Sequence, residues 1–173
     1  MPHIQSFPPI ENPAAHILIL GSMPGKESLR AGQYYAHPRN AFWPIMGELV
    51  GAAPALPYDA RIQKLKSAGI ALWDVLASCR RHSSMDSDIE ADSICPNDFE
   101  SFFRKHPHIT HVFFNGTVAE QCFHKYVRCL PDNRPLHYQR LPSTSPANAS
   151  MSYKQKLNAW RVILSITHDS AAG

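Results

Sequence analysis

Short apolar runs, each followed by glycine or polar residues, constrain the fold of this chain more than any other feature. The runs 17–20, 70–75 and 110–114 are apolar almost throughout, and 138–141 is a weaker fourth run. Runs of this length and composition favour buried strands over helices. Strands that are apolar on both faces are typical of a parallel sheet with helices packed on each side. The sequence therefore predicts an α/β fold.

Segments with helical spacing separate these runs. In 41–50 the apolar residues recur every three or four positions, and Gly51 follows as a stop signal. Thr117 and Glu120 have the spacing of a capping box at a helix start. The polar stretches 22–40 and 78–92 are predicted to be loops. The predicted helices are 41–50, 58–67, 97–105, 117 to about 128, and 152–167.

Length and composition bound the class of protein. The 173 residues suit a single domain, in which we expect the first residues, about 15, to form an extended arm. A net charge of +3 excludes proteins that bind DNA by positive charge alone. We see no secretory signal and no apolar run near the ~20 residues of a membrane span, so we expect a cytoplasmic protein outside the membrane. CxxC, P-loop, GxGxxG and HExxH motifs are absent, so we expect neither metal nor cofactor.

The segments that follow the predicted strands are the candidates for a functional site, because ligands of parallel sheets bind beyond the carboxyl ends of the strands. The first of them combines Tyr34 and Tyr35 with His37, Arg39 and Asn40. Aromatic faces beside cationic and amide groups suit a stacked nucleic-acid base and a bound phosphate. The same aromatic residues also suit an ordinary hydrophobic core.

The other three segments each allow two interpretations. Asp74 ends an apolar run, where its carboxylate can accept a hydrogen bond from a base or form a structural ion pair or helix cap. Arg80 and Arg81 suit phosphate contacts or a solvated loop. Asn115 precedes a helix start, which suits an anion or a simple turn. Three hydroxyls and two prolines in 142–148 suit a stiff phosphate-binding loop or a plain surface loop.

Four stretches occur in a characteristic order: GSMPG at 21–25, QYYAHPRNAFWPIMG at 33–47, LWDVLASCRR at 72–81 and LPSTSPAN at 141–148. Together they resemble the uracil-DNA glycosylase superfamily, and most closely its DNA-deoxyinosine (hypoxanthine-DNA) glycosylase branch, over about residues 17–160. The resemblance implies a three-layer α/β/α sandwich with a four-stranded parallel sheet. It also implies a monofunctional enzyme of base excision repair, which flips a deaminated base out of double-stranded DNA and hydrolyses its N-glycosidic bond.

The resemblance further implies roles for individual residues. Asn40 matches the catalytic Asn of this branch, and Phe42 matches the aromatic residue on which the flipped base stacks. The remaining base-binding candidates are Gly21, Ser22, Met23, Tyr35, Asp74 and Asn115. The DNA-binding candidates are His37, Arg39, Arg80, Arg81, Ser143, Thr144, Ser145 and Asn148. The expected base is hypoxanthine, with uracil or xanthine as alternatives, and we expect a monomer.

Three positions depart from the pattern of relatives. Met23 stands where many relatives have an Asp or Asn that positions water, and Leu141 stands where some have a catalytic His. Ser145 stands at about the place of a Leu wedge in others. Asn40 therefore remains as the catalytic candidate, and we expect its carbonyl to direct a water molecule at C1′ of the sugar. The alternatives are a non-catalytic module that binds damaged DNA and an enzyme that acts on free nucleosides.

Overall fold

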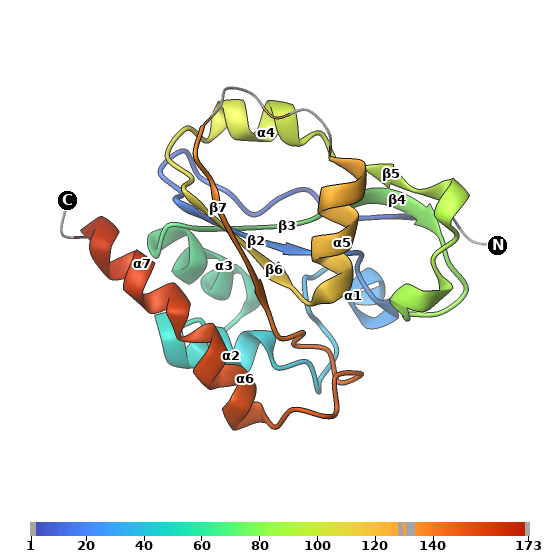
Figure 1. Cartoon of the computed structure of the whole chain (residues 1–173). Helices are drawn as coiled ribbons and strands as arrows, with labels where there is room; N and C mark the ends of the chain where they lie inside the picture. Colours follow the sequence, from blue (N-terminus) through green and yellow to red (C-terminus); the bar gives the residue numbers. More distant parts are fainter. Residues whose placement is uncertain (1–2, 128–129, 131–133, 172–173) are drawn as a thin grey trace.

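The computed structural model describes residues 3–127, 130 and 134–171 (Figure 1). Its main sheet contains β2 (Ile17–Gly21), β3 (Ile70–Asp74), β6 (His111–Asn115) and β7 (His137–Leu141) in the order β3-β2-β6-β7. All three neighbouring pairs are parallel. The four predicted strands are thus confirmed, each with its ends shifted by no more than one residue.

Alternate residues of the central strand β2 are buried on opposite faces of this sheet. Ile17 and Ile19 pack into a core with helices α2 (Phe42–Val50), α3 (Tyr58–Ser67), α6 (Tyr153–Trp160) and α7 (Val162–Ala171). Leu18 and Leu20 pack into a second core with α4 (Phe99–Lys105) and α5 (Thr117–Tyr126). Figure 1 shows the two helical layers on either side of the strands. The expected three-layer α/β/α sandwich is therefore confirmed.

A second, antiparallel sheet was not predicted. It joins β1 (His3–Gln5), β4 (Leu76–Arg80) and β5 (Cys95–Pro96) in the order β1-β4-β5. The expected loop at 78–92 therefore begins inside a strand, and the N-terminal arm pairs with that strand. Only Leu76 and Cys79 of β4 are buried, so its hydrophobic pattern is too sparse to identify a strand from sequence.

Three helix predictions were wrong in detail. The expected loop at 22–40 contains α1 (Lys26–Ala31). Thr117 does not cap α5: Gly116 precedes the helix with φ +96°, and a capping box instead joins Ser152 and Gln155 at the start of α6. The single predicted helix at 152–167 is divided at Arg161 into α6 and α7. The expected end of the helix near 128 lies outside the described residues. No helix in the described part is long and apolar enough to cross a membrane.

Candidate functional site

A pocket of about 170 Å³ opens at the carboxyl ends of the parallel strands. Its lining includes Gly21 from the end of β2, Asp74 from the end of β3 and Asn115 from the end of β6. Ser143, just after β7, completes this side of the pocket. The four segments predicted from sequence therefore meet at one site, because parallel strands bring their carboxyl ends to one edge of the sheet.

Asn40 lines the pocket in a fixed orientation at the start of α2. Its Oδ1 accepts a hydrogen bond from the Phe42 backbone N–H at 2.9 Å, and its own backbone N–H donates to the His37 carbonyl at 2.9 Å. A carboxamide oxygen has two lone pairs, and its amide group has two N–H donors. The Asn40 side chain is therefore held by the backbone while one lone pair of Oδ1 remains for a ligand or water.

Tyr35, rather than Phe42, provides the aromatic surface of the pocket. Phe42 is fully buried in the core and does not line the pocket, which corrects its expected direct contact with a base. The Tyr35 ring stacks on Phe42, with centroids 4.2 Å apart and planes 30° apart, and it does line the pocket. The backbone of Tyr35 has φ +54°, a left-handed conformation that is uncommon for a bulky residue and costs about 1–3 kcal/mol. Such strain is typical of functional sites.

The pocket has no room for a side chain at Gly21. A Cβ there would lie 2.6 Å from Asp74 Oδ1 and 2.9 Å from the Tyr35 hydroxyl, both closer than normal van der Waals contact. The backbone carbonyls of Gly21 and Ser22 accept hydrogen bonds from the N–H groups of Val75 and Leu76. The strand-end loop is therefore tied to the chain that leaves β3. Met23 lies almost buried beside it and lines the pocket.

Asp74 is a buried carboxyl group with an altered pKa. Its side chain is 3% exposed, and its Oδ2 has no hydrogen-bond partner among the described residues. The pKa of Asp74 is raised to about 7, chiefly by burial and secondarily by the negative charge of Asp86, while the positive charge of Arg81 opposes the shift. Among the described residues, this carboxyl group forms neither the structural ion pair nor the helix cap that the sequence left as alternatives.

Asp86 is a pocket residue that sequence reasoning missed. It begins a 3-10 helix (Asp86–Asp88) within the stretch predicted to be a polar loop, where no periodicity indicated its direction. Its Oδ1 accepts a hydrogen bond from the Ser22 hydroxyl at 2.7 Å, so Ser22 holds this carboxyl at the pocket. Burial raises the pKa of Asp86, whereas the Ser22 hydrogen bond and the positive Arg81 lower it.

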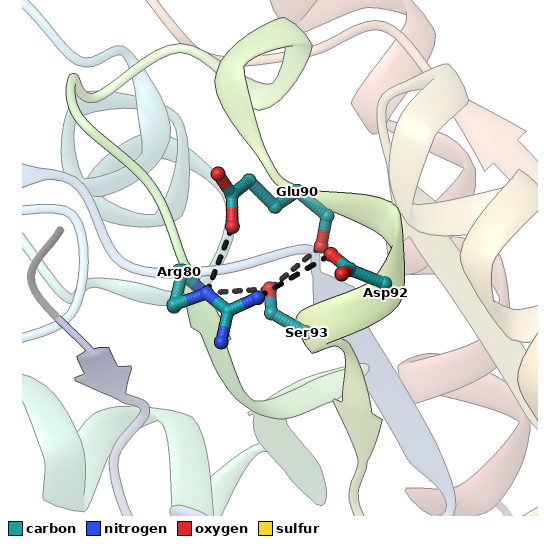
Figure 2. A network of polar contacts seen from close by, with 4 residues as sticks. All are labelled: Arg80, Glu90, Asp92 and Ser93. Atoms are coloured by element: carbon teal, nitrogen blue, oxygen red, sulfur yellow. Dashed lines mark hydrogen bonds and ion pairs between the residues drawn. The ribbon is translucent and has the colours of Figure 1, made fainter.

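Arg80 and Arg81 were both expected to contact DNA, but the guanidinium group of each interacts with other parts of the protein. Arg81 is 1% exposed and donates from Nη2 to the Pro24 carbonyl at 2.5 Å, so it cannot reach a phosphate. Arg80 forms ion pairs with Glu90 at 2.8 Å and Asp92 at 3.5 Å, and its backbone N–H donates to the Ser93 hydroxyl (Figure 2). Because two carboxylates compensate its charge, Arg80 adds little attraction for DNA.

Asn115 and Thr144 form a reciprocal pair that fixes the loop after β7. Asn115 Nδ2 donates to Thr144 Oγ1, and Asn115 Oδ1 accepts from the Thr144 backbone N–H, both at 2.9 Å. The Thr144 carbonyl in turn accepts from the Ala41 N–H at 3.0 Å, next to Asn40. Thr144 is 1% exposed but lines the pocket, so its hydrogen bonds to Asn115 hold the loop and its expected contact with DNA stays a prediction. Asn115 also lines the pocket.

The rest of the 142–148 loop is held by its own polar groups. The Ser143 hydroxyl accepts from the Ser145 N–H, and the Ser145 hydroxyl accepts from the Ala147 N–H. Asn148 donates to the Ser143 carbonyl and does not line the pocket. Lys156 from α6 donates to the Ser145 carbonyl at 3.2 Å. Ser143 and Ser145 therefore line the pocket in a stiff loop, and each keeps a hydroxyl hydrogen to donate.

His37 and Arg39 lie just before Asn40. His37 lines the pocket, and its Nδ1 accepts a hydrogen bond from the Arg39 backbone N–H at 3.0 Å. Arg39 is exposed. No ion pair of the Arg39 guanidinium is found among the described residues. Their contacts with DNA remain predictions.

Comparisons with known proteins agree with this geometry. Residues 8–164 match the family model described as the Uracil DNA glycosylase superfamily. A protein from Methanosarcina barkeri named Hypoxanthine DNA glycosylase is 39% identical over 159 residues, covering 90% of this chain and 94% of the relative. One of the same name from Methanosarcina acetivorans is 35% identical, covering 92% and 96%. A solution NMR structure from M. acetivorans, named as a candidate uracil DNA glycosylase, is 31% identical with a TM-score of 0.71, covering 93% and 98%.

Proposed function

Because the chain belongs to the uracil DNA glycosylase superfamily, we propose that this DNA glycosylase removes hypoxanthine from deoxyinosine in double-stranded DNA and leaves an abasic site for base excision repair. The observation that supports the proposal most directly is the shared pocket of Asn40, Tyr35 and Asp74 at the strand ends. It combines an aromatic surface for a planar base with polar groups for its edge. The names of two relatives favour hypoxanthine over uracil or xanthine.

The proposed reaction begins with extrusion of the damaged nucleotide from the duplex. Extrusion costs a few kcal/mol and costs least at a mispair, which favours deaminated bases before any contact in the pocket is made. The flipped base then stacks on the exposed side of Tyr35, whose ring is supported from behind by Phe42. Polar groups of Asp74 and Asn115 contact the base edge.

Asn40 is the proposed catalytic residue. One lone pair of its Oδ1 is used by the Phe42 N–H, and the other accepts a hydrogen bond from the water that attacks C1′. A neutral amide is a weak base, so this arrangement is effective only if the sugar has developed oxocarbenium character before the water bonds to it, as in other glycoside hydrolysis. The contribution of Asn40 is then mainly the position of the water.

Contacts with the phosphates come from a small set of residues around the pocket mouth. The candidates are His37 and its neighbour Arg39 before α2, and Ser143 and Ser145 in the stiff loop after β7. We propose that the protein binds DNA as a monomer. Because few cationic groups take part, its affinity for DNA should depend only modestly on salt concentration.

The test uses duplex oligonucleotides that contain hypoxanthine, uracil or xanthine at one position. After incubation with the protein, alkali cleaves any abasic site, and the fragments are measured under single-turnover conditions. We expect cleavage at hypoxanthine. Asn40→Ala should lower the rate by about 100-fold or more while duplex binding is retained. Asn158→Ala, an exposed asparagine on α6, is the matched control and should react as the unaltered protein does.

Other outcomes would overturn the proposal. Binding to the damaged duplex with no abasic product would indicate a recognition module. Hydrolysis of free deoxyinosine without activity on the duplex would indicate a nucleoside hydrolase. Near-full turnover by Asn40→Ala would refute its catalytic role.

A further inference from the structure

Two carboxyl groups of the pocket lining interact with the same buried guanidinium group. Asp74 and Asp86 both line the pocket, and the buried Arg81 interacts electrostatically with both. Asp86 has a hydrogen-bond donor in Ser22, at 2.7 Å. The Oδ2 of Asp74 is buried without a partner among the described residues. The buried Arg81 is therefore shared by two carboxyl groups, and among the described residues a side-chain donor is found for Asp86 but not for Asp74 Oδ2.

This arrangement decides which carboxyl keeps a proton. Burial raises the pKa of Asp86 as well, but the Ser22 hydroxyl, which donates to it at 2.7 Å, and the positive Arg81 both oppose that shift and favour its anion. Asp74 faces that anion and is more deeply buried, and its pKa is raised to about 7. The hydroxyls of Tyr34 and Tyr35, which also interact with Asp74, are neutral because burial raises the pKa of each above the usual range. His37 is a further polar residue of the pocket lining.

We propose that Asp74 acts on the flipped base as a neutral carboxylic acid, whose O–H donates to the acceptor edge of the leaving hypoxanthine, and that Asp86 positions this proton. The inference rests on the proposed function. A carboxylic acid offers one donor and one acceptor side by side, whereas a carboxylate offers acceptors only. Hypoxanthine offers N1–H next to the O6 acceptor, so the neutral acid can satisfy both atoms and the carboxylate would repel O6.

The same proton assists bond cleavage. When the C1′–N9 bond breaks, its electron pair goes to the base, which becomes anionic. The Asp74 proton moves along its hydrogen bond to the base, which leaves neutral, and Asp74 becomes a carboxylate. The water that bonds to C1′ releases one proton, and this proton restores the carboxyl group. The balance is deoxyinosine plus water giving the sugar hydroxyl plus hypoxanthine.

The pH dependence of the single-turnover excision rate on a deoxyinosine duplex tests this assignment. Because the neutral acid is the active form and its pKa is about 7, the rate at pH 8 should be about tenfold below the acidic plateau. Asp86→Asn removes the negative neighbour, so the descending limb should move to lower pH by about one unit. Asp74→Asn keeps a hydrogen-bond donor and an acceptor but cannot titrate. Its excision should be slower than that of the unaltered protein, and its pH–rate profile should lack the descending limb.

Two matched controls separate this effect from general changes. Asp88→Asn alters a carboxyl group of the same 3-10 helix that bonds to Ser83 and does not line the pocket, so its profile should not change. His37→Gln replaces another polar side chain of the pocket lining and should keep the descending limb of the profile. A limb that persists in Asp74→Asn, or that Asp86→Asn does not move, would overturn the inference.

An inactive variant has no measurable pH–rate profile. In that case a spectroscopic titration of the free protein tests the inference. Carboxyl carbons labelled with ¹³C should show one aspartate that protonates near neutral pH, which disappears in Asp74→Asn and shifts to lower pH in Asp86→Asn. If no aspartate titrates there, the inference is wrong even though excision occurs. If the titration is found but no base is released from any duplex, the proposed function fails instead.

Discussion

Replacing Asp74 by Asn should stabilise the protein, and the gain should grow with pH. Burial raises the pKa of Asp74 from 3.8 to about 7, so the folded protein keeps a proton that the unfolded chain has released over about three pH units. Each such unit costs the folded state about 1.4 kcal/mol, which gives about 4 kcal/mol in full. The cost is absent below about pH 4, accumulates as the pH rises, and is complete above pH 7.

Urea unfolding at pH 4, 6 and 8 measures this difference. The free energy of unfolding of Asp74→Asn minus that of the unaltered protein should rise by about 4 kcal/mol across this range. Asp59→Asn, on the exposed first turn of α3, is the control and should show no such rise. A difference for Asp74→Asn that does not vary with pH would refute the reasoning, because it would mean that the carboxyl titrates alike in both states.

Three further predictions concern the pocket and its surroundings. Gly21→Ala should slow excision at least about tenfold by filling the pocket, whereas Gly25→Ala, whose added Cβ would lie 3.6 Å from its neighbours, should not; single-turnover rates compare them. Tyr35→Phe keeps the ring but removes a buried hydroxyl that has no hydrogen-bond partner among the described residues, so unfolding experiments should show a gain of about 1 kcal/mol while excision slows. Arg39→Ala should lower the salt slope of duplex affinity by about one, whereas Arg81→Ala should leave the slope unchanged and cost about 3 kcal/mol of stability.

Three strands of the parallel sheet, β2, β3 and β6, could be predicted because they are apolar on both faces, whereas β7 is exposed at four of its five residues and gave a weaker signal. The pattern of β2, buried at every residue, is found in the sequence without knowledge of its neighbours. The antiparallel sheet could not be predicted in this way. Its strand β4 is half-exposed and short, and its pairing with β1 joins residues more than 70 positions apart. Such pairing depends on tertiary contacts rather than on local pattern.

The predicted strand ends indicated where the pocket lies, but they did not indicate which side chains face it. Asn40, Tyr35 and Asp74 follow or precede elements whose ends were predicted, and they line the pocket. Phe42 and Arg81 have the residue types that a DNA site needs, yet both are buried. Residue type indicates a possible contact, whereas helix rotation and loop path determine exposure.

Asp86 is the opposite case, because it lines the pocket although neither its residue type nor its spacing identified it. It belongs to a stretch with several acidic and polar residues, of which only this aspartate bonds to Ser22 at the pocket. No spacing distinguishes it from Asp88 two positions later, which bonds to Ser83 instead. The path of the loop between β4 and β5 selects it, and that path depends on the second sheet.

Direct detection of the released base tests the central claim. The protein is incubated with a duplex that contains one deoxyinosine, and mass spectrometry quantifies free hypoxanthine alongside the abasic strand. The account predicts equal amounts of both products for the unaltered protein, and neither for Asn40→Ala despite retained binding. Stable binding of the duplex by the unaltered protein without release of hypoxanthine would contradict it.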